Sequence, residues 1–165
     1  MSNNLLVIID FQNAFINQYT IKAKEEIPKL LKSKKYNNVL FTRFLNSKSN
    51  PVYQKLGWDK CTDIESAKIC IDTTGYDVLN KTTYTALNDE MRKYIAEKQI
   101  STIYLCGIDA ECCVLATALN MFESNYDVRV LEDYIYCMCG EKAKKNTIEI
   151  LGRNIGKQNI IKFIV

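Results

Sequence analysis

Three side chains that could carry out nucleophilic chemistry stand near the ends of apolar, strand-like runs of this sequence. Cys113 lies at the start of a helix-like run, after an apolar run that ends at Gly107. Unpaired backbone N–H groups and the positive end of a helix dipole favour the thiolate of a cysteine in such a place. Asp10 directly follows the first strand-like run, and Lys81 follows the third. The three residues predict attack by a thiolate on an electrophilic carbon.

The chain contains no histidine, and this restricts how a nucleophile could be activated. Cys–His and Ser–His–Asp catalysis are excluded, so the proton of Cys113 must pass to a carboxylate or a lysine system. Lys81 would lower the pKa of the thiol from its ordinary value of ~8.5. Asp10 would either accept the thiol proton, or hold Lys81 in place and later move a proton to the leaving group. Backbone N–H groups of Asp109 and Cys113 would supply an oxyanion hole.

Apolar runs rich in β-branched residues alternate with helical patterns, and these elements must position the three residues. The runs predict six strands at Leu5–Ile9, Asn38–Thr42, Asp77–Leu79, Thr102–Cys106, Val128–Leu131 and Ile160–Ile164. Helices are predicted at about Glu25 to Lys35, after an N-cap at Asn88, at Cys112 to Glu123 and at about Glu141 to Leu151. Pro28 fits the first of these helices only in its first turn. Residues 44–75 form a long irregular segment, which is expected to be functional or to carry short helices.

Strand–helix alternation on this rhythm predicts an α/β fold of three layers, with helices on both faces of a six-stranded parallel sheet. Ligands of such sheets bind at the carboxyl ends of the strands, where the strand order reverses. With the Rossmann-like order 3-2-1-4-5-6, the first and fourth strands are neighbours at that point. Asp10 and Cys113 would then face one crevice from its two sides. The length of 165 residues favours a single domain over residues 1–165.

Three segments of the sequence carry a resemblance to a known family. They are Leu6–Phe15 (LVIIDFQNAF), Asp77–Tyr84 (DVLNKTTY) and Gly107–Ala118 (GIDAECCVLATA). In these motifs the chain resembles the isochorismatase-like cysteine hydrolases, which include nicotinamidases and N-carbamoylsarcosine amidohydrolase. Their order and spacing fit nearly the whole chain. The resemblance implies an Asp–Lys–Cys triad at Asp10, Lys81 and Cys113, and a cis peptide bond before Asp109.

The sequence departs from the family pattern in two places. Ala110 and Glu111 stand where members commonly have Thr-Asp, so the turn loses a hydroxyl group. Nicotinamidases carry an aspartate and two histidines after the second strand, where they bind a metal, whereas the segment Thr42–Trp58 contains no histidine. We therefore expect a metal-free branch of the family, with no cofactor.

The resemblance also implies what this chain acts on. True isochorismatases cleave a vinyl ether and need no cysteine nucleophile, so the retained Cys113 favours acyl chemistry. We expect a hydrolase that cleaves a small amide, imide or ureido substrate through a thioester intermediate. Homodimers or larger homo-oligomers are also expected, since they are common in the family.

Three other functions are open. One is a catalytically idle family member that serves protein association, although the retained Asp10, Lys81 and Cys113 argue against it. A second is an enzyme of the nicotinamidase or isochorismatase type with altered substrate binding. A third is a thiol redox protein, which the sequence disfavours because no Cys-x-x-Cys motif stands at a helix start.

Several side chains in or near the strand-end loops are candidates for substrate binding. The aromatic residues Phe15, Phe44, Trp58 and Tyr84 either line an apolar pocket or serve as core and subunit contacts. Arg43, after the second strand, either binds a substrate carboxylate or pairs with an acidic neighbour.

The remaining cysteines in suggestive places are expected to be structural. A disulfide between the neighbours Cys112 and Cys113 would be strained, which favours a core thiol at Cys112. Cys137 and Cys139 match no common zinc spacing, and without histidine a zinc site would need four thiolates. They are therefore expected to be core or loop thiols.

Charge and hydropathy argue against nucleic-acid and membrane partners, and a small-molecule substrate is expected. The net charge of +3 is too small, and the lysines too dispersed, to indicate nucleic-acid binding. No apolar run approaches the ~18 residues of a membrane-spanning helix. The first strand is predicted to begin within four residues of the N-terminus, so no signal peptide is expected. A cytoplasmic location with reduced cysteines is expected.

Overall fold

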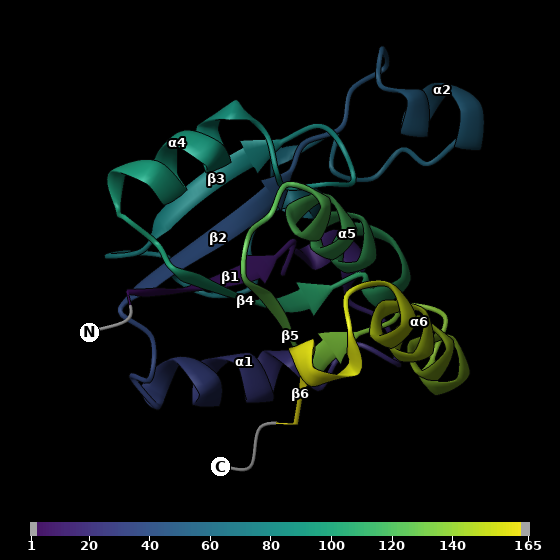
Figure 1. The fold of residues 1–165 in the computed structure, drawn as a ribbon. Coiled ribbons are helices and arrows are strands. Elements are labelled where there is room, and N and C mark those ends of the chain that lie inside the picture. Colours follow the sequence, from purple (N-terminus) through teal and green to yellow (C-terminus); the bar gives the residue numbers. More distant parts are fainter. Residues whose placement is uncertain (1–2, 163–165) are drawn as a thin grey trace.

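The computed structural model describes residues 3–162 and contains one six-stranded parallel sheet (Figure 1). Its strands are β1 (Asn4–Ile9), β2 (Asn38–Phe44), β3 (Asp77–Lys81), β4 (Thr102–Ile108), β5 (Val128–Tyr136) and β6 (Ile160–Ile161). The α-helices are α1 (Ala23–Lys32), α2 (Pro51–Leu56), α3 (Ile64–Ala67), α4 (Asp89–Glu97), α5 (Leu115–Glu123) and α6 (Glu141–Asn154). The strand order is β3-β2-β1-β4-β5-β6. The predicted fold class and strand order are confirmed.

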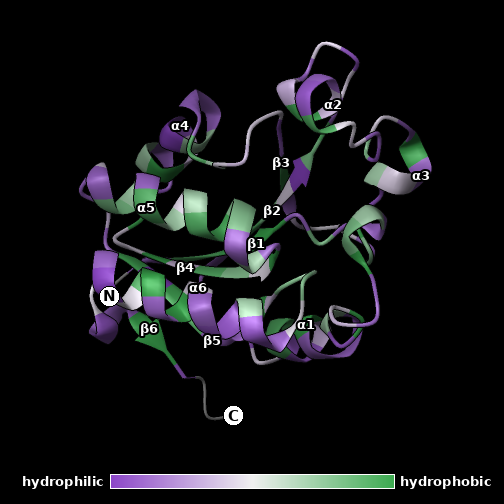
Figure 2. Cartoon of the chain, turned by 90° about the vertical axis from the view of Figure 1, so that its right-hand side faces the viewer, coloured by the Kyte–Doolittle hydropathy of each residue, from purple (hydrophilic) through white to green (hydrophobic). Residues whose placement is uncertain are grey.

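Helices cover both faces of the sheet, so the central strand β1 is buried on both sides. Val7 and Ile9 of β1 belong to a core cluster with side chains of α4, α5 and α6. Leu6 and Ile8 belong to a second cluster with α1 and the segment between β2 and β3. In Figure 2 the hydrophobic colour follows the central strands, while the outer helices carry much of the hydrophilic colour. A continuous apolar run such as β1 is typical of a strand covered on both faces.

Pro28 lies in the interior of α1, so the prediction that it occupies the first turn was wrong. The helix begins at Ala23, earlier than expected. Because proline lacks an N–H group, it cannot bond to the Lys24 carbonyl four residues before it. The buried face of Ile27 and Leu30 packs on the second core cluster and outweighs this lost bond.

Other boundaries differ from prediction at positions that matter for the site. β3 includes Lys81, and β4 runs through Gly107 as far as Ile108. The segment between β2 and β3 carries the short helices α2 and α3, and short helices were one of the two expectations for residues 44–75. The predicted strand Ile160–Ile164 is observed at its first two residues, and its last two lie outside the described residues.

Membrane insertion through a helix has no support within residues 3–162, since none of the helices there combines the length and the apolar character that crossing a bilayer requires.

Candidate active site

Asp10, Lys81 and Cys113 meet at the carboxyl ends of β1, β3 and β4. Lys81 Nζ lies 2.6 Å from Asp10 Oδ2 and 3.6 Å from Cys113 Sγ. The exposed fractions are 0% for Asp10, 2% for Lys81 and 4% for Cys113. The three residues come from distant parts of the chain, and the parallel sheet aligns the ends of their strands at one edge. We call them the Asp10–Lys81–Cys113 cluster.

A close approach of β4 to β1 places Asp10 beside the turn that carries Cys113. Gly107 pairs with Ile9, the residue before Asp10. A Cβ atom at Gly107 would lie 2.1 Å from the Ile9 carbonyl oxygen, and Gly107 has a φ of +114°. Only glycine accommodates both the contact and this backbone conformation.

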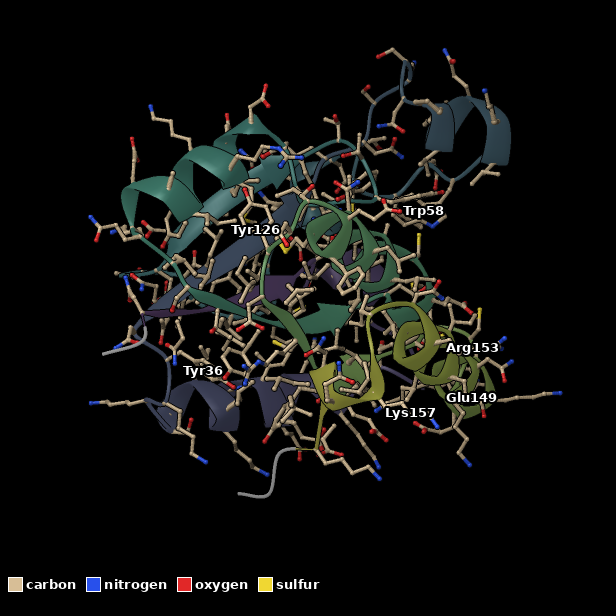
Figure 3. All side chains as sticks on the ribbon, in the orientation of Figure 1. Tyr36, Trp58, Tyr126, Glu149, Arg153 and Lys157 are labelled. Carbon is tan, nitrogen blue, oxygen red and sulfur yellow. The ribbon has the colours of Figure 1, made fainter. Side chains whose placement is uncertain are left out.

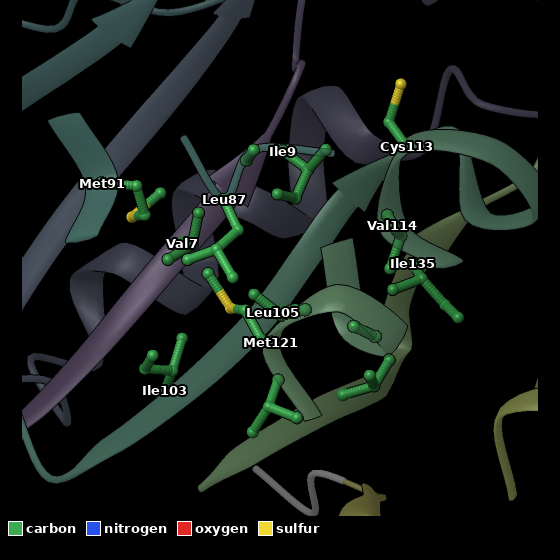
Figure 4. Packing of buried hydrophobic residues seen from close by; sticks show 14 of the residues in the cluster. Val7, Ile9, Leu87, Met91, Ile103, Leu105, Cys113, Val114, Met121 and Ile135 are labelled. Carbon is green, nitrogen blue, oxygen red and sulfur yellow. The ribbon is translucent and has the colours of Figure 1, made fainter. Parts of the chain in front are cut away.

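Cys113 lies in a π-helical turn, Ala110–Val114, and not in the first turn of an α-helix as predicted. The Asp109 carbonyl accepts hydrogen bonds from the Cys112 and Val114 amides, both at 3.1 Å. A cis peptide bond precedes Asp109, as the family resemblance implied. π-Turns of this kind are frequent at functional sites. In Figure 4 the Cys113 sulfur points away from the packed core side chains below it.

Lys81 is a buried ammonium with a full set of partners. Besides Asp10 and Cys113, its Nζ donates to the carbonyls of Thr83 at 2.8 Å and Tyr84 at 3.1 Å. It also lies 5.0 Å from the centre of the Phe44 ring. Burial disfavours the charged form, but Asp10 and Cys113 outweigh it and raise the pKa of Lys81 above its ordinary value. The side chain is therefore positively charged at neutral pH.

The side chain of Thr42 orients Asp10, a role that nothing in the sequence signalled. Its hydroxyl oxygen accepts from the Asp10 backbone N–H at 3.0 Å, and the hydroxyl donates to Asp10 Oδ1 at 2.7 Å. Asp10 Oδ2 is turned toward Lys81 and has no other hydrogen-bond partner among the described residues. Thr42 therefore fixes which carboxylate oxygen faces the ammonium.

We expect Thr42→Val to lower the free energy of unfolding by about 2–3 kcal/mol, since the isosteric side chain leaves two buried polar groups of Asp10 unsatisfied. It should also move the midpoint of Cys113 alkylation to lower pH, because Asp10, whose charge raises the pKa of the thiol, is then free to turn away. Urea unfolding and the rate of iodoacetamide labelling against pH measure the two effects. Thr42→Ser, which keeps the hydroxyl, serves as the matched control. Equal stability of the Val and Ser variants would contradict this role.

The pKa of the Cys113 thiol is raised above its ordinary value. Hydrogen bonding with the side chain of Cys112 raises it most, followed by burial and the charge of Asp10, whereas Lys81 lowers it. In the same pair, the hydrogen bond with Cys113 lowers the pKa of Cys112. The resting Cys113 is therefore a thiol, and the electrostatic contribution that favours its thiolate comes from Lys81.

A cavity of about 280 Å³ opens at Cys113, with mostly apolar walls. The four aromatic residues predicted for the substrate pocket all line it, namely Phe15, Phe44, Trp58 and Tyr84. Trp58 stacks on Phe15, with ring centres 5.4 Å apart. Figure 3 shows Trp58 below the α2 segment. Sequence reasoning did not identify Val52, Leu56, Cys112 and Met138 as part of these walls.

Arg43 does not belong to this cavity. Its Nε donates to Asn80 Oδ1 at 2.8 Å, and the residue lines a separate depression together with Lys68. Successive residues of a strand point to opposite faces of the sheet. Because Phe44 faces the cavity, its neighbour Arg43 points away from it.

Buried amide side chains hold the long segment after β2 against the sheet. Gln12 Nε2 donates to the carbonyls of Phe44 and Ala67, both at 2.9 Å, and Gln12 Oε1 accepts from the Phe44 amide at 2.7 Å. Asn46 Nδ2 donates to the Trp58 carbonyl at 2.8 Å. These bonds satisfy backbone groups that have no strand partner, and they fix the aromatic wall of the cavity.

Comparison with known proteins places the chain in a family. The Isochorismatase domain model matches residues 4–147. Isochorismatase family protein 2A of Dictyostelium discoideum is 33% identical over 58 residues, which cover 34% of this chain and 29% of that protein. Isochorismatase domain-containing protein 2 of Xenopus laevis is 28% identical over 74 residues, covering 44% of this chain and 34% of that protein. The aligned part is thus about a third of the length of each relative.

Solved structures share the fold at low sequence identity. An isochorismatase-like hydrolase from Alkaliphilus metalliredigens has a TM-score of 0.86 at 13% identity, covering 98% of this chain and 95% of that one. The pyrazinamidase of Pyrococcus horikoshii in complex with zinc has a TM-score of 0.79 at 20% identity, covering 98% and 99%. The yeast nicotinamidase bound to nicotinaldehyde has a TM-score of 0.83 at 18% identity, covering 97% and 100%.

Residues 43–58, where nicotinamidases were expected to carry metal ligands, do not fit a metal in this chain. Residues 43–58 contain no carboxylate, histidine or thiol. The Phe44 ring instead lies over Lys81 and 6.1 Å from the Trp58 ring. Hydrolysis without a metal stays a prediction, and it rests on the absence of ligand atoms in residues 43–58.

Proposed function

The chain belongs to the isochorismatase family of hydrolases, and from that premise we propose that it hydrolyses a small amide, imide or ureido substrate with Cys113 as the nucleophile. The observation that carries this proposal is the position of Lys81 Nζ, within 2.6 Å of Asp10 Oδ2 and 3.6 Å of Cys113 Sγ, at the wall of an apolar cavity. A buried ion pair in contact with a thiol is suited to moving the proton of that thiol.

In the proposed reaction, Cys113 Sγ attacks the carbonyl carbon while the thiol proton passes to the Asp10 carboxylate. The tetrahedral intermediate then expels the amine, which takes this proton from Asp10, and a thioester remains on Cys113. A water molecule gives a proton to Asp10 and attacks the thioester. The leaving sulfur recovers that proton, which restores the thiol. Lys81 keeps its charge throughout and stabilises the thiolate as it forms.

The oxyanion of the tetrahedral intermediate is proposed to accept hydrogen bonds from the backbone N–H groups of Asp109 and Cys113. Both belong to the turn between β4 and α5, which Gly107 brings against β1. Fixed donors of this kind stabilise charge where it develops and need no reorganisation during the reaction.

The walls of the cavity favour a small, weakly polar acyl group. The cavity volume of about 280 Å³ lies near the lower end of the range for small-molecule pockets. Arg43 lies outside it, so no arginine is available there to bind a substrate carboxylate. We therefore propose neutral carboxamides or ureido compounds, including ring carboxamides of the kind that nicotinamidases and pyrazinamidases hydrolyse, as substrates to test first.

The test is direct detection of the acyl-enzyme. The protein is mixed with a panel of neutral amides and activated esters, quenched in acid and analysed by intact mass, and tryptic peptides locate the added mass. We expect an acyl adduct on Cys113 and none on the neighbouring cavity residue Cys112. If the chain is a catalytically idle family member, no reagent should acylate Cys113 faster than it acylates an ordinary thiol. An adduct confined to Cys112 would also overturn the proposal.

We expect Trp58→Ala to lower kcat/KM for a ring carboxamide about 10- to 200-fold, chiefly through KM, because it removes an apolar wall worth about 1–3 kcal/mol. Steady-state kinetics measure this loss. Alkylation of Cys113 by iodoacetamide is the control, and its rate should stay within about twofold, since the ring partners of Trp58 are Phe15 and Phe44, which lie outside the Asp10–Lys81–Cys113 cluster. A loss confined to kcat would contradict a role in substrate binding.

A further inference from the structure

Four side chains with ligand atoms gather at the carboxyl ends of β4 and β5. Asp109 and Glu111 follow β4, whereas Cys137 and Cys139 follow β5. A carboxylate oxygen of Asp109, a carboxylate oxygen of Glu111 and Cys137 Sγ all lie within 4.8 Å of one another. Cys139 stands two residues after Cys137, on the same turn, and its side chain is exposed. The mechanism proposed above uses none of these four side chains.

The backbone that carries the two thiols is held in place without any ligand. The Gly140 amide donates to the Cys137 carbonyl at 3.1 Å, which closes a turn over both cysteines. The Met138 amide, at the middle of this turn, donates to Asp109 Oδ1 at 3.1 Å. Asn17 Nδ2 donates to the Met138 carbonyl at 2.9 Å. The thiols are therefore presented to the carboxylates by a rigid loop.

The chemistry of the donor set suits a borderline-soft divalent cation. Zinc accepts thiolate sulfur at about 2.3 Å and carboxylate oxygen at about 2.0–2.2 Å, usually with four ligands. In the sequence, Cys137 and Cys139 stand near each other without a histidine. The carboxylates of Asp109 and Glu111 come close to Cys137 only in the folded chain. Small side-chain rotations are enough to bring atoms within 4.8 Å of one another onto one ion.

A buried thiol points into this group. Cys137 is 3% exposed, and its Sγ lies within 4.8 Å of a carboxylate oxygen of Asp109 and one of Glu111. A bound cation would reverse the effect of the surrounding negative charge and displace the thiol protons.

We propose that Asp109, Glu111, Cys137 and Cys139 form a binding site for a zinc-class divalent cation, separate from the Asp10–Lys81–Cys113 cluster. The cation would connect the turn after β4 to the turn after β5. Because Asp109 also belongs to the proposed oxyanion turn, binding would rigidify that turn. The site neither requires the proposed hydrolase reaction nor supplies a step in it.

The test is titration of the untagged, reduced full-length chain with Cd²⁺ and with Zn²⁺. The absence of histidine removes the commonest source of background binding. Thiolate-to-cadmium charge-transfer absorption reports sulfur ligation, and calorimetry gives stoichiometry and affinity. Cys139→Ala and Glu111→Gln are the test variants. Cys139 is exposed and Glu111 half-buried, so neither change should unfold the protein. A Cys112→Ala/Cys113→Ala double variant is the matched control for the cavity thiols.

We expect one equivalent of Cd²⁺ with charge-transfer absorption, an affinity at least tenfold weaker in each test variant, and an affinity within twofold of wild type in the control. The melting temperature should rise with added Zn²⁺, because a ligand of the folded state stabilises it. Absence of binding, binding that both test variants retain, or binding lost in the control would each overturn the site. Activity after chelation is a separate readout, and its survival or loss leaves these outcomes unchanged.

Discussion

Replacement of Cys113 by alanine is expected to lower kcat by about 10³–10⁶, because a covalent mechanism has no substitute for its nucleophile. The thiol lies at the cavity wall, 3.6 Å from the Lys81 ammonium. Activity is measured on whichever amide forms the acyl-enzyme, at saturating substrate concentration. Turnover within about tenfold of wild type would end the covalent proposal.

Cys112→Ala is the matched control for that experiment. Cys112 also lines the cavity, stands next to the nucleophile and loses the same atom on substitution. We expect its kcat to stay within about tenfold of wild type, with a change in the pH profile because its hydrogen bond with Cys113 contributes to the pKa of the nucleophile. If Cys112→Ala were the inactive variant and Cys113→Ala the active one, the two roles would have to be exchanged.

Replacement of Lys81 by alanine is expected to affect reactivity and stability together. The pKa of Cys113 is lowered by Lys81 and raised by Asp10, so removing the ammonium moves the midpoint of alkylation to higher pH. The same change leaves the buried Asp10 carboxylate without its partner at 2.6 Å, which costs about 3–5 kcal/mol of unfolding free energy. The rate of Cys113 labelling against pH and urea unfolding measure these effects.

Two further variants separate the electrostatic effect from simple unfolding. An Asp10→Asn/Lys81→Met double variant removes both buried charges, so it should recover stability relative to Lys81→Ala while hydrolysis stays lost. Lys93→Ala removes an exposed cation that pairs weakly with Glu97, and it should leave the alkylation profile unchanged. An unshifted midpoint in folded Lys81→Ala would show that Lys81 does not act on the thiol.

The fold could be predicted from the sequence because its signals are local. The continuous apolar run of β1 and its neighbours indicated buried parallel strands, and the Asn88 cap, which accepts from the Met91 amide at 2.9 Å, marked a helix start. The strand-end positions of Asp10 and Lys81 then followed from the parallel topology. Pro28 was misplaced because the packing of the helix face outweighs the loss of one backbone hydrogen bond.

Only the tertiary structure decided how the candidate site is built. The hydroxyl of Thr42 on Asp10, the amide of Gln12 on the segment after β2, and the exclusion of Arg43 from the cavity depend on contacts between residues far apart in sequence. The same holds for the thiols after β5, which acquire carboxylate neighbours only when β4 and β5 lie side by side. Residue types and local periodicity determined which elements form and which groups could react. Distances between side chains, and with them pKa values and ligand sets, arise only when the sheet brings its strand ends to one edge.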